Sequence, residues 1–255
     1  MIIRKSAAEI EAMARAGRIV VETLTLLGEQ IRPGTTTAEL DVLADDFIRS
    51  QGGAPTFKGY RGYPASICTS PNDMIVHGIP GPYALEEADI LSIDVGVTLD
   101  GYVADSAYTF AVGRIDPETE RLLEVCQDAL AAGVEQCQPG GRLSDISHAV
   151  QRVTEENGYS VVRALVGHGV GRSMHEDPQI PNFGPPGRGP ELAPGMVFAI
   201  EPMINAGGPD IQVADDRWSI STADGSLSAH FEHTVAVTEA GPRILTLAEA
   251  PVAGR

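Results

Sequence analysis

Five residues that bind metal ions through oxygen or nitrogen are spread along the chain, each in a short apolar stretch with the character of a strand. They are Asp94, Asp105, His168, Glu201 and Glu232. A carboxylate in apolar surroundings costs free energy unless a partner offsets its charge. Two divalent cations would neutralise the four carboxylates, and the one neutral imidazole would fill a remaining position. The residue types therefore indicate a site for two metal ions.

The spacing of the first two carboxylates follows from a predicted hairpin. Asp100-Gly101 is a strong two-residue turn between two runs with strand character. In the register that this turn sets, Asp105 pairs with Gly96. Asp94 then pairs with Ala107, so the two aspartates are diagonal neighbours on one face of the hairpin. From a backbone spacing of roughly 7–8 Å their side chains can hold cations about 3.5–4 Å apart, the separation used in metal-assisted hydrolysis.

The predicted ligand set favours a group of metals without choosing one. Oxygen-rich ligation with a single histidine suits divalent Co, Mn, Fe, Zn or Ni better than a site that depends on thiolates would. We therefore expect two divalent metal ions as cofactors and leave their identity open.

The elements that must position these ligands repeat at an offset of 106 residues. Pro33-Gly34 returns as Pro139-Gly140, and a helical pattern precedes each pair. The first helix should begin with a capping box from Ser6 to Glu9, and its counterpart should start near Pro117. After each Pro-Gly we expect a short helix that ends in glycine, followed by strands.

The repeat extends to the ligands. Ile93-Asp94 corresponds to Ile200-Glu201, and residues 105–112 resemble residues 232–237. Each half of the chain should therefore donate a carboxylate pair from strands, which places the metals at a pseudo-symmetric centre where two sheets meet. We expect an α+β fold with a single catalytic domain over residues 1–255, built from halves of about 1–113 and 114–255.

Length and composition indicate a soluble, cytoplasmic protein. The 255 residues are 43% hydrophobic, which is enough for a sizeable core, and they include no linker between independent domains. The N-terminus resembles neither a signal peptide nor a transmembrane segment. Cys68, Cys126 and Cys137 are odd in number and lack CxxC spacing, so free thiols in a reducing compartment are expected.

The charge of the chain argues against two classes of partner. Its 18 basic and 35 acidic residues give a formal net charge of −17. Such a charge opposes autonomous binding to nucleic acid or to an anionic membrane. We expect no direct nucleic-acid or membrane binding.

Two longer motifs accompany the ligands. They are Asn-Asp-Met-Ile-Val-His-Gly-Ile-Pro at residues 72–80 and His-Gly-Val-Gly-Arg-Ser-Met-His-Glu-Asp-Pro at residues 168–178. Each motif is weak by itself, but with the five ligands in this order the chain resembles the type I methionine aminopeptidases, from the first helix to Ile244-Leu245-Thr246. The resemblance implies the pita-bread fold, a pseudo-twofold arrangement with central antiparallel sheets covered by helices, and a dinuclear metal centre that removes the initiator methionine from new polypeptides.

The resemblance also implies a role for each ligand. Asp94 would chelate one metal, whereas Asp105 and Glu232 would bridge both. His168 and Glu201 would bind the other metal. A metal-bridged water or hydroxide would attack the scissile peptide bond. Glu201 would also be the general base and proton shuttle.

Two further histidines become catalytic through the resemblance. His77 and His175 follow turn-rich sequence and could direct neutral imidazoles at the substrate amide or at the oxyanion. A lone histidine is more often structural, but the motifs reverse that preference. His230 and His233 are expected to flank Glu232 on the opposite strand face and to support the ligands or be structural.

The resemblance implies an apolar, polarizable pocket for the methionine side chain. Its lining would come from Tyr60, Tyr63, Cys68, Met174 and Trp218. Two positions depart from common usage in the family. Met174 stands where Phe is frequent and Arg61 where His is frequent, which puts the fine substrate preference in doubt but not the reaction.

The implied substrates are the N-termini of nascent polypeptides near the ribosome. A small second residue should be favoured, because the scissile bond must approach the metals closely. The chain is expected to act as a monomer.

Two other functions fit part of the pattern. The same fold serves Xaa-Pro aminopeptidases and dipeptidases, but those usually carry an additional N-terminal domain that 255 residues do not accommodate. A pita-bread domain can also be a non-catalytic peptide-binding module, and such modules typically lose metal ligands. The presence of all five ligands favours an active enzyme.

Overall fold

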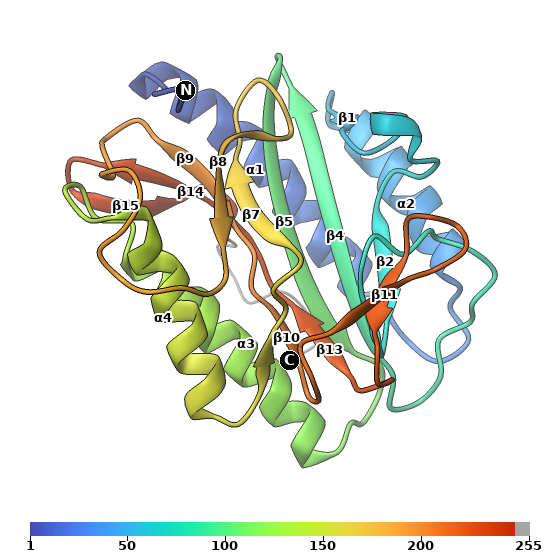
Figure 1. Cartoon of the computed structure of the whole chain (residues 1–255). Coiled ribbons are helices and arrows are strands. Elements are labelled where there is room, and N and C mark those ends of the chain that lie inside the picture. The colour runs from blue at the N-terminus through green and yellow to red at the C-terminus, as the bar shows by residue number, and fades with distance from the viewer. Residues whose placement is uncertain (248–255) are drawn as a thin grey trace.

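Helices cover the outer faces of antiparallel sheets in this chain (Figure 1). The structure is a computed structural model that describes residues 1–247. The last eight residues of the expected second half, 248–255, lie outside the described residues. Within residues 1–247 no helix is both long enough and apolar enough to cross a membrane.

The helices reproduce the repeat that the sequence predicted. They are α1 (Ala7–Gly28), α2 (Thr37–Ser50), α3 (Pro117–Glu135) and α4 (Leu143–Glu156). The capping box is confirmed, because the Ser6 hydroxyl accepts from the Glu9 backbone N–H while the Glu9 carboxylate accepts from the Ser6 backbone N–H. The predicted start of α3 at Pro117 is also confirmed. The bounds of α2 and α4 differ by 106 residues, which is the offset of the repeat.

Two larger sheets carry most of the predicted ligands. In the first, β4 (Ile90–Leu99) lies between β1 (Ala54–Pro55) and β2 (Cys68–Pro71), and it also pairs with β5 (Tyr102–Ala111). The second has the order β15 (Gly241–Ile244), β14 (His233–Thr238), β9 (Val197–Ile200), β7 (Val166–Gly169) and β8 (Glu176–Pro181). All of their pairings are antiparallel.

Two three-stranded sheets complete the fold. One has the order β13 (Ser228–His230), β10 (Met203–Asn205) and β6 (Ser160–Val161). The other has the order β11 (Ile211–Val213), β12 (Ile220–Thr222) and β3 (Met74–Val76).

The predicted hairpin register is confirmed. Gly96 pairs with Asp105, and Asp94 pairs with Ala107. The turn residues Asp100 and Gly101 have φ values of 51° and 78°, as a primed hairpin turn requires. Asp and Gly tolerate positive φ better than other residues, so this dipeptide sets the register and, with it, the shared face of the two aspartates.

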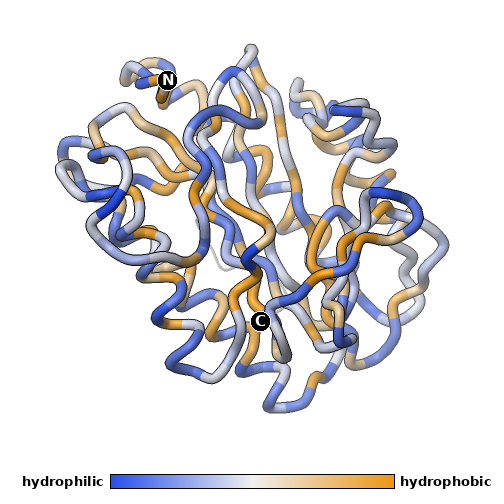
Figure 2. The backbone as a smooth tube through the Cα atoms, viewed as in Figure 1, coloured by the Kyte–Doolittle hydropathy of each residue, from blue (hydrophilic) through white to orange (hydrophobic). Residues whose placement is uncertain are grey.

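Three of the four buried clusters among residues 1–247 pack the helices against the two larger sheets. One lies between the first pair of helices and the β4–β5 hairpin, and another between α3, α4 and the sheet of β9 and β14. The third lies between the two halves and includes Met13, Tyr63, Cys68, Met174 and Val197. Figure 2 shows the apolar residues concentrated along the central strands and the hydrophilic ones along the surrounding loops. Each fully buried large apolar side chain contributes about 1.5–3 kcal/mol, and β4, β5 and β9 each place such side chains in these clusters.

The cysteines agree with their interpretation from the sequence. Cys68, Cys126 and Cys137 are all buried and free. The prediction of free thiols is therefore confirmed.

Candidate metal centre

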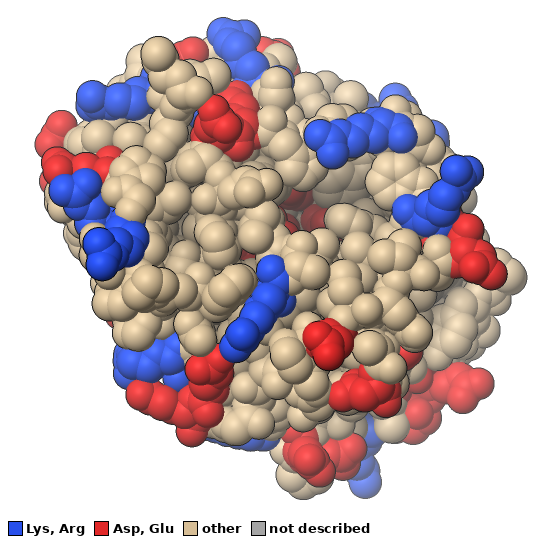
Figure 3. Space-filling model, viewed as in Figure 1, with Lys and Arg blue, Asp and Glu red and all other residues tan. Residues whose placement is uncertain are grey.

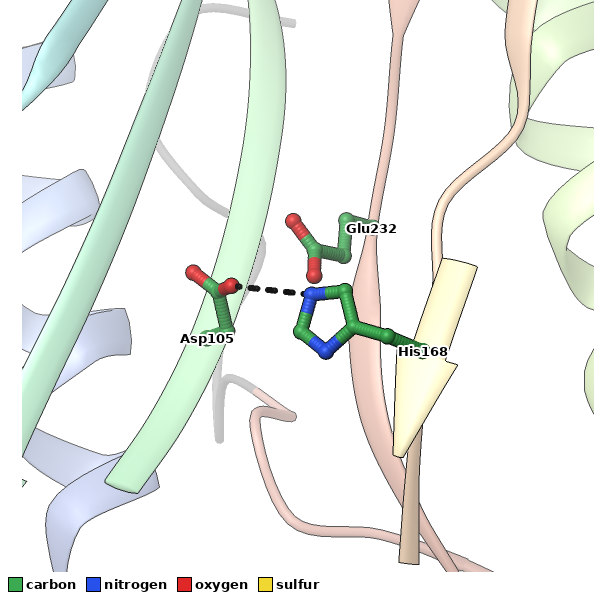
Figure 4. A group of neighbouring side chains, drawn as sticks. All are labelled: Asp105, His168 and Glu232. Atoms are coloured by element: carbon green, nitrogen blue, oxygen red, sulfur yellow. Dashed lines mark ion pairs between the residues drawn. The ribbon is translucent and has the colours of Figure 1, made fainter. Parts of the chain in front are cut away.

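Asp105, His168 and Glu232 point toward one another from three separate segments (Figure 4). Asp105 lies on β5, His168 on β7, and Glu232 in the short connection between β13 and β14. One ligand atom from each lies within 4.8 Å of the other two, and all three residues are buried. The structure thus brings together three ligands that are separated by up to 127 residues in the sequence.

Asp94 and Glu201 complete the group. Asp94, on β4, is a close neighbour of Asp105, and Glu201 Oε1 lies 3.5 Å from His168 Nε2. Both side chains are half-buried, whereas the other three ligands are buried. Figure 3 shows a hollow near the middle of one face with acidic side chains at its base. Asp94 and Glu201 are therefore the ligands of this group that are most accessible to solvent.

Hydrogen bonds between the two halves hold the ligand-bearing segments in register. Thr234 Oγ1 accepts the Asp105 backbone N–H at 2.9 Å and donates to the Asp105 carbonyl at 2.8 Å. The Glu232 backbone N–H donates to the Ala107 carbonyl at 3.0 Å. Thr109 forms a similar pair of bonds with the backbone of His230. The edge of β5 is therefore joined directly to the segment that contributes Glu232.

His168 is oriented as a metal ligand. Its Nδ1 lies 2.9 Å from the Gly169 carbonyl oxygen. A carbonyl oxygen can only accept, so Nδ1 carries the proton and Nε2 presents its lone pair. That lone pair faces Glu201 Oε1 at 3.5 Å and Asp105 Oδ2 at 3.9 Å. Burial lowers the pKa of His168, which keeps the imidazole neutral.

The carboxyl groups have the electrostatics of a cation site. Burial raises the pKa of Asp94 to about 7. Burial also raises the pKa of Asp105, Glu201 and Glu232 well above the ordinary range, and repulsion between neighbouring carboxylates adds to the effect. A cluster of this kind is stable in its charged form only when cations offset the repulsion.

Unpartnered oxygens show that the donors fit metal ions. Asp94 Oδ1, Asp105 Oδ1 and Glu232 Oε1 are buried and have no hydrogen-bond partner among residues 1–247. Buried polar atoms normally have such partners. With the lone pair of His168, these oxygens form a donor set of the hard and borderline type that divalent metals prefer.

The two histidines that the sequence singled out as catalytic lie beside the centre. The rings of His175 and His168 have centroids 4.2 Å apart, and the hydroxyl of Tyr60 lies 2.8 Å from His175 Nδ1. His77 has a φ of 61°, a conformation that costs energy for a residue other than glycine. Burial lowers the pKa of both His77 and His175 to about 4, so both imidazoles are neutral near pH 7.

The five residues predicted to contact the methionine side chain also come together. Tyr63, Cys68 and Met174 are buried in the cluster between the halves, and Tyr60 and Trp218 pack against it. The Tyr63 and Trp218 rings meet edge to face with centroids 5.1 Å apart. Cys68 pairs with Asp94 across β2 and β4, so the cluster adjoins the metal ligands.

Arg61 also lies at this part of the site. Its guanidinium carbon is 5.4 Å from the centroid of the Tyr60 ring. Both residues belong to the short 3-10 helix Tyr60–Gly62. The departure from family usage at residue 61 therefore lies beside the predicted pocket.

One expectation about the remaining histidines is wrong. His230 does not lie on the opposite face from the Glu232 carboxylate, because its Nε2 is 4.0 Å from Glu232 Oε2. The two residues are two positions apart, and positions of that spacing share a face in extended chain. His233 does point elsewhere, with Nδ1 3.1 Å from Thr246 Oγ1.

The sequence interpretation missed residues that hold the ligands in place. Thr234 braces the backbone of Asp105, and Asn182 Nδ2 donates to the Glu201 carbonyl at 2.9 Å. Thr234 lies two positions from Glu232, so strand alternation could have placed it on the ligand face. No comparable local signal pointed to Asn182.

Comparison with known proteins identifies the family. Residues 11–239 match metallopeptidase family M24. A methionine aminopeptidase of Clostridium perfringens is 53% identical over 247 residues, which are 97% of this chain and 99% of that protein. Methionine aminopeptidase 1 of Bacillus subtilis is 52% identical, with 96% of this chain and 99% of that protein covered.

Solved structures agree with this match. The crystal structure of methionine aminopeptidase from Rickettsia prowazekii has a TM-score of 0.96 and 42% identity, and the match covers 97% of this chain and 100% of that one. A prolidase from Pyrococcus furiosus is similar in fold, with a TM-score of 0.78 and 24% identity, but the match covers only 66% of that longer chain. The pita-bread fold expected from the sequence is confirmed. The chain therefore belongs to metallopeptidase family M24 and, within it, to the methionine aminopeptidases.

Proposed function

We propose that this chain is a metal-dependent aminopeptidase that removes N-terminal methionine from polypeptides with a small second residue. The metal centre carries this proposal. Four carboxylates and one neutral imidazole converge there, and three carboxylate oxygens have no hydrogen-bond partner among residues 1–247. The 53% identity with a methionine aminopeptidase supports the choice of substrate.

Together the five residues would bind two divalent ions. Asp94 would bind one ion, Asp105 and Glu232 would bridge both, and His168 and Glu201 would bind the other. When bound, the ions activate a water molecule and polarise the scissile carbonyl. The oxygen-rich donor set with one nitrogen suits Co, Mn, Fe, Zn or Ni.

Glu201 would move the proton in this reaction. Its side chain is 15% exposed, and its backbone carbonyl is held by Asn182. A carboxylate that is positioned in this way and open to the substrate can take a proton from the attacking water and deliver it to the leaving amine.

His77 and His175 would stabilise the reacting peptide group. Both are neutral near pH 7, and a neutral imidazole can donate through one nitrogen and accept through the other. If the Tyr60 hydroxyl donates to His175 Nδ1, then Nε2 carries a hydrogen that it can donate to the oxyanion. His77 would hydrogen-bond the substrate amide.

The methionine side chain would occupy the apolar surface beside Asp94. Its lining would be Tyr60, Tyr63, Cys68, Met174 and Trp218. An aromatic and sulfur-containing lining favours a polarizable thioether. Because Cys68 adjoins Asp94, a methionine seated there would leave its peptide bond near the metal ligands.

The setting of the reaction is part of the proposal. The chain would act in the cytoplasm as a single catalytic domain and a monomer, on the N-termini of nascent polypeptides near the ribosome. Its formal charge of −17 is consistent with a peptide substrate rather than direct binding to nucleic acid or to a membrane.

Release of free methionine tests this function. Metal-stripped protein should be assayed with Met-Ala-Ser and Met-Lys-Ser, with and without added Mn(II), Fe(II) or Co(II). We expect metal-dependent cleavage of Met-Ala-Ser and little cleavage of Met-Lys-Ser, because a bulky second residue keeps the scissile bond away from the metals. Equal cleavage of both peptides would contradict the proposed specificity.

The alternatives make different predictions in the same assay. Cleavage of an Xaa-Pro dipeptide alone would indicate a prolidase. Binding of methionine peptides without cleavage under any metal would indicate a non-catalytic module.

A further inference from the structure

A buried ion pair connects the N-terminal segment to the turn that carries His175. Lys5 Nζ lies 2.7 Å from Glu176 Oε2, and the two side chains are only 5% and 7% exposed. Among the ion pairs that lysine and arginine form within residues 1–247, no other has both side chains less than 10% exposed. We call Lys5 and Glu176 the N-terminal clamp.

Glu176 holds the turn that precedes it. Its second carboxylate oxygen, Oε1, accepts the backbone N–H groups of Arg172 at 2.9 Å and Ser173 at 3.3 Å. The turn ends in Met174 and His175, two residues of the proposed site. One carboxylate therefore binds Lys5 with one oxygen and shapes this turn with the other.

Lys5 is itself anchored. Its backbone N–H donates to the Gly195 carbonyl at 2.6 Å, and its Nζ donates to the Ile3 carbonyl at 3.3 Å. Its position is therefore set by the N-terminal segment and by the loop before β9. Through its ion pair with Glu176, Lys5 therefore helps to fix the position of the turn.

Gly171 shows how closely the clamp is packed. A Cβ at this position would lie 2.5 Å from Lys5 Cε and 2.6 Å from Glu176 Oε1, so any other residue would displace the ends of these two side chains. The Gly171 carbonyl also accepts the Val103 backbone N–H at 2.7 Å. The start of the turn is thereby attached to β5, two residues before Asp105.

We propose that Lys5 and Glu176 are positioning residues for His175: the buried pair fixes the turn at residues 171–175 so that the imidazole faces the reacting peptide bond. This inference rests on the proposed function. Two apolar side chains could fill the same space without the cost of desolvating two charges. The Glu176 carboxylate instead accepts three charge-assisted hydrogen bonds, from Lys5 Nζ and from the backbone N–H groups of Arg172 and Ser173. Apolar packing would not supply bonds of such defined direction.

The first test separates positioning from general stability. Lys5→Met keeps the aliphatic stem and removes the charge, and it should lower kcat for Met-Ala-Ser about tenfold or more, because small displacements of a catalytic group are costly. In a His175→Ala background the same substitution should change kcat by less than about twofold, because residues that act through one another are not additive. Equal losses in the two backgrounds would overturn the proposal.

A second variant addresses the stability of the turn. Lys5→Met alone leaves a buried, uncompensated carboxylate and should lower Tm. The double variant Lys5→Met/Glu176→Gln removes both charges but keeps an oxygen to accept the Arg172 and Ser173 N–H groups. Its Tm should return toward that of the unmodified chain while kcat stays low. Recovery of kcat together with Tm would show that the loss was only one of stability, and would overturn the proposal.

Two controls and an independent readout complete the experiment. Arg152→Met breaks an ion pair whose side chains are 54% and 62% exposed and should change neither kcat nor Tm. Mn(II) affinity, measured by calorimetry, should stay within about twofold in Lys5→Met, because Lys5 contacts none of the five ligands. The imidazole NMR resonances of His175, identified by their loss in His175→Ala, should shift or broaden in Lys5→Met. Unchanged His175 resonances would overturn the positioning role of Lys5 and Glu176, whether or not the chain cleaves Met-Ala-Ser. Failure to cleave Met-Ala-Ser would by itself overturn only the proposed function.

Discussion

The two carboxylate pairs of the metal centre are built in different ways. Asp94 and Asp105 lie within two ten-residue strands joined by a two-residue turn. Glu201 and Glu232 lie just beyond the paired ends of β9 and β14, whose ladder stops where Ile200 faces His233. The first pair is therefore placed by local register. The second pair needs contacts with other parts of the chain.

For Glu232 those contacts come from the first half, whereas the Glu201 carbonyl is held by Asn182 within its own half. The Glu232 backbone N–H binds the Ala107 carbonyl, and Thr234 holds both backbone groups of Asp105. The hairpin thus positions Glu232. The first carboxylate pair is specified by local register, whereas Glu232 is positioned only when the two halves of the chain meet.

The largest effect should follow when a ligand is removed from either pair. Asp105→Asn and Glu232→Gln should each lower kcat/KM for Met-Ala-Ser about a thousandfold or more, because each side chain is proposed to bridge both ions. Tm and circular dichroism should show that the fold is retained. Full turnover by either variant at saturating metal would contradict the bridging role.

A smaller effect should follow when only the contact between the halves is broken. Thr234→Val removes two hydrogen bonds to the Asp105 backbone and should weaken Mn(II) binding about 10–100-fold, as is usual for groups that support metal ligands. Thr98→Val is a matched control. Thr98 lies on the hairpin, and its substitution breaks a 2.8 Å hydrogen bond to Thr56 that involves none of the five ligands. If Thr234→Val and Thr98→Val changed the calorimetric affinity for Mn(II) equally, the distinction between the two carboxylate pairs would be lost.

Stabilisation by metal should increase with pH. The folded-state pKa of Asp94 is raised to about 7, and the pKa values of the other three carboxyl groups are raised well above their ordinary range. A group whose folded pKa lies above its unfolded value binds more protons in the folded state, so stability falls as pH rises from about 4 toward 7 and beyond. Metal ions compete with these protons. The difference in Tm between Mn(II)-loaded and metal-stripped protein should therefore grow from pH 5 to pH 7.5, and a constant difference would contradict this account.

The smallest effect concerns the helices behind the two sheets. Asp45 on α2 has an 18% exposed side chain and binds Arg49, Lys58 and Ser66, and the Arg49 hydrogen bond is the main cause that lowers its pKa. Its folded pKa is below the unfolded value, so its contribution is present above about pH 4 and is lost as pH falls below that. Asp45→Asn should cost about 1–2 kcal/mol in urea unfolding at pH 7 and less at pH 3.

The repeat supplies the control for that experiment. The equivalent position on α4, 106 residues later, is Gln151, whose amide oxygen accepts the Gly184 N–H. Gln151→Asn keeps the amide and carries no charge. Its effect on stability should not change between pH 3 and pH 7, and a pH-dependent effect would contradict the assignment to Asp45.

Much of the fold was predictable because the signals are local. The turn at Asp100-Gly101 needs positive φ at both residues, which few dipeptides allow, and it determines which residues of the hairpin share a face. The capping box at Ser6 and the proline at residue 117 likewise act through their nearest neighbours. Such features depend on short-range sterics and hydrogen bonds, so they are the same before and after the chain becomes compact.

The two failures have different reasons. His230 lies two positions before Glu232, a spacing that shares a face in extended chain, so strand alternation should have placed its ring beside the Glu232 carboxylate. Asn182 was missed because its partner, the Glu201 carbonyl, lies across a loop. The orientation of Asn182 therefore depends on a contact that its neighbouring residues do not encode.

Residue type and short-range geometry were enough to indicate the five candidate ligands, the register that joins Asp94 to Asp105 and the repeat of the helices. The bracing of Asp105 by Thr234 and the contact of Lys5 with Glu176 across 171 residues arise only in the folded chain. Contacts of that range form only when burial of the apolar strands and helices brings distant segments together, and the positions of polar groups within the resulting core then follow from packing.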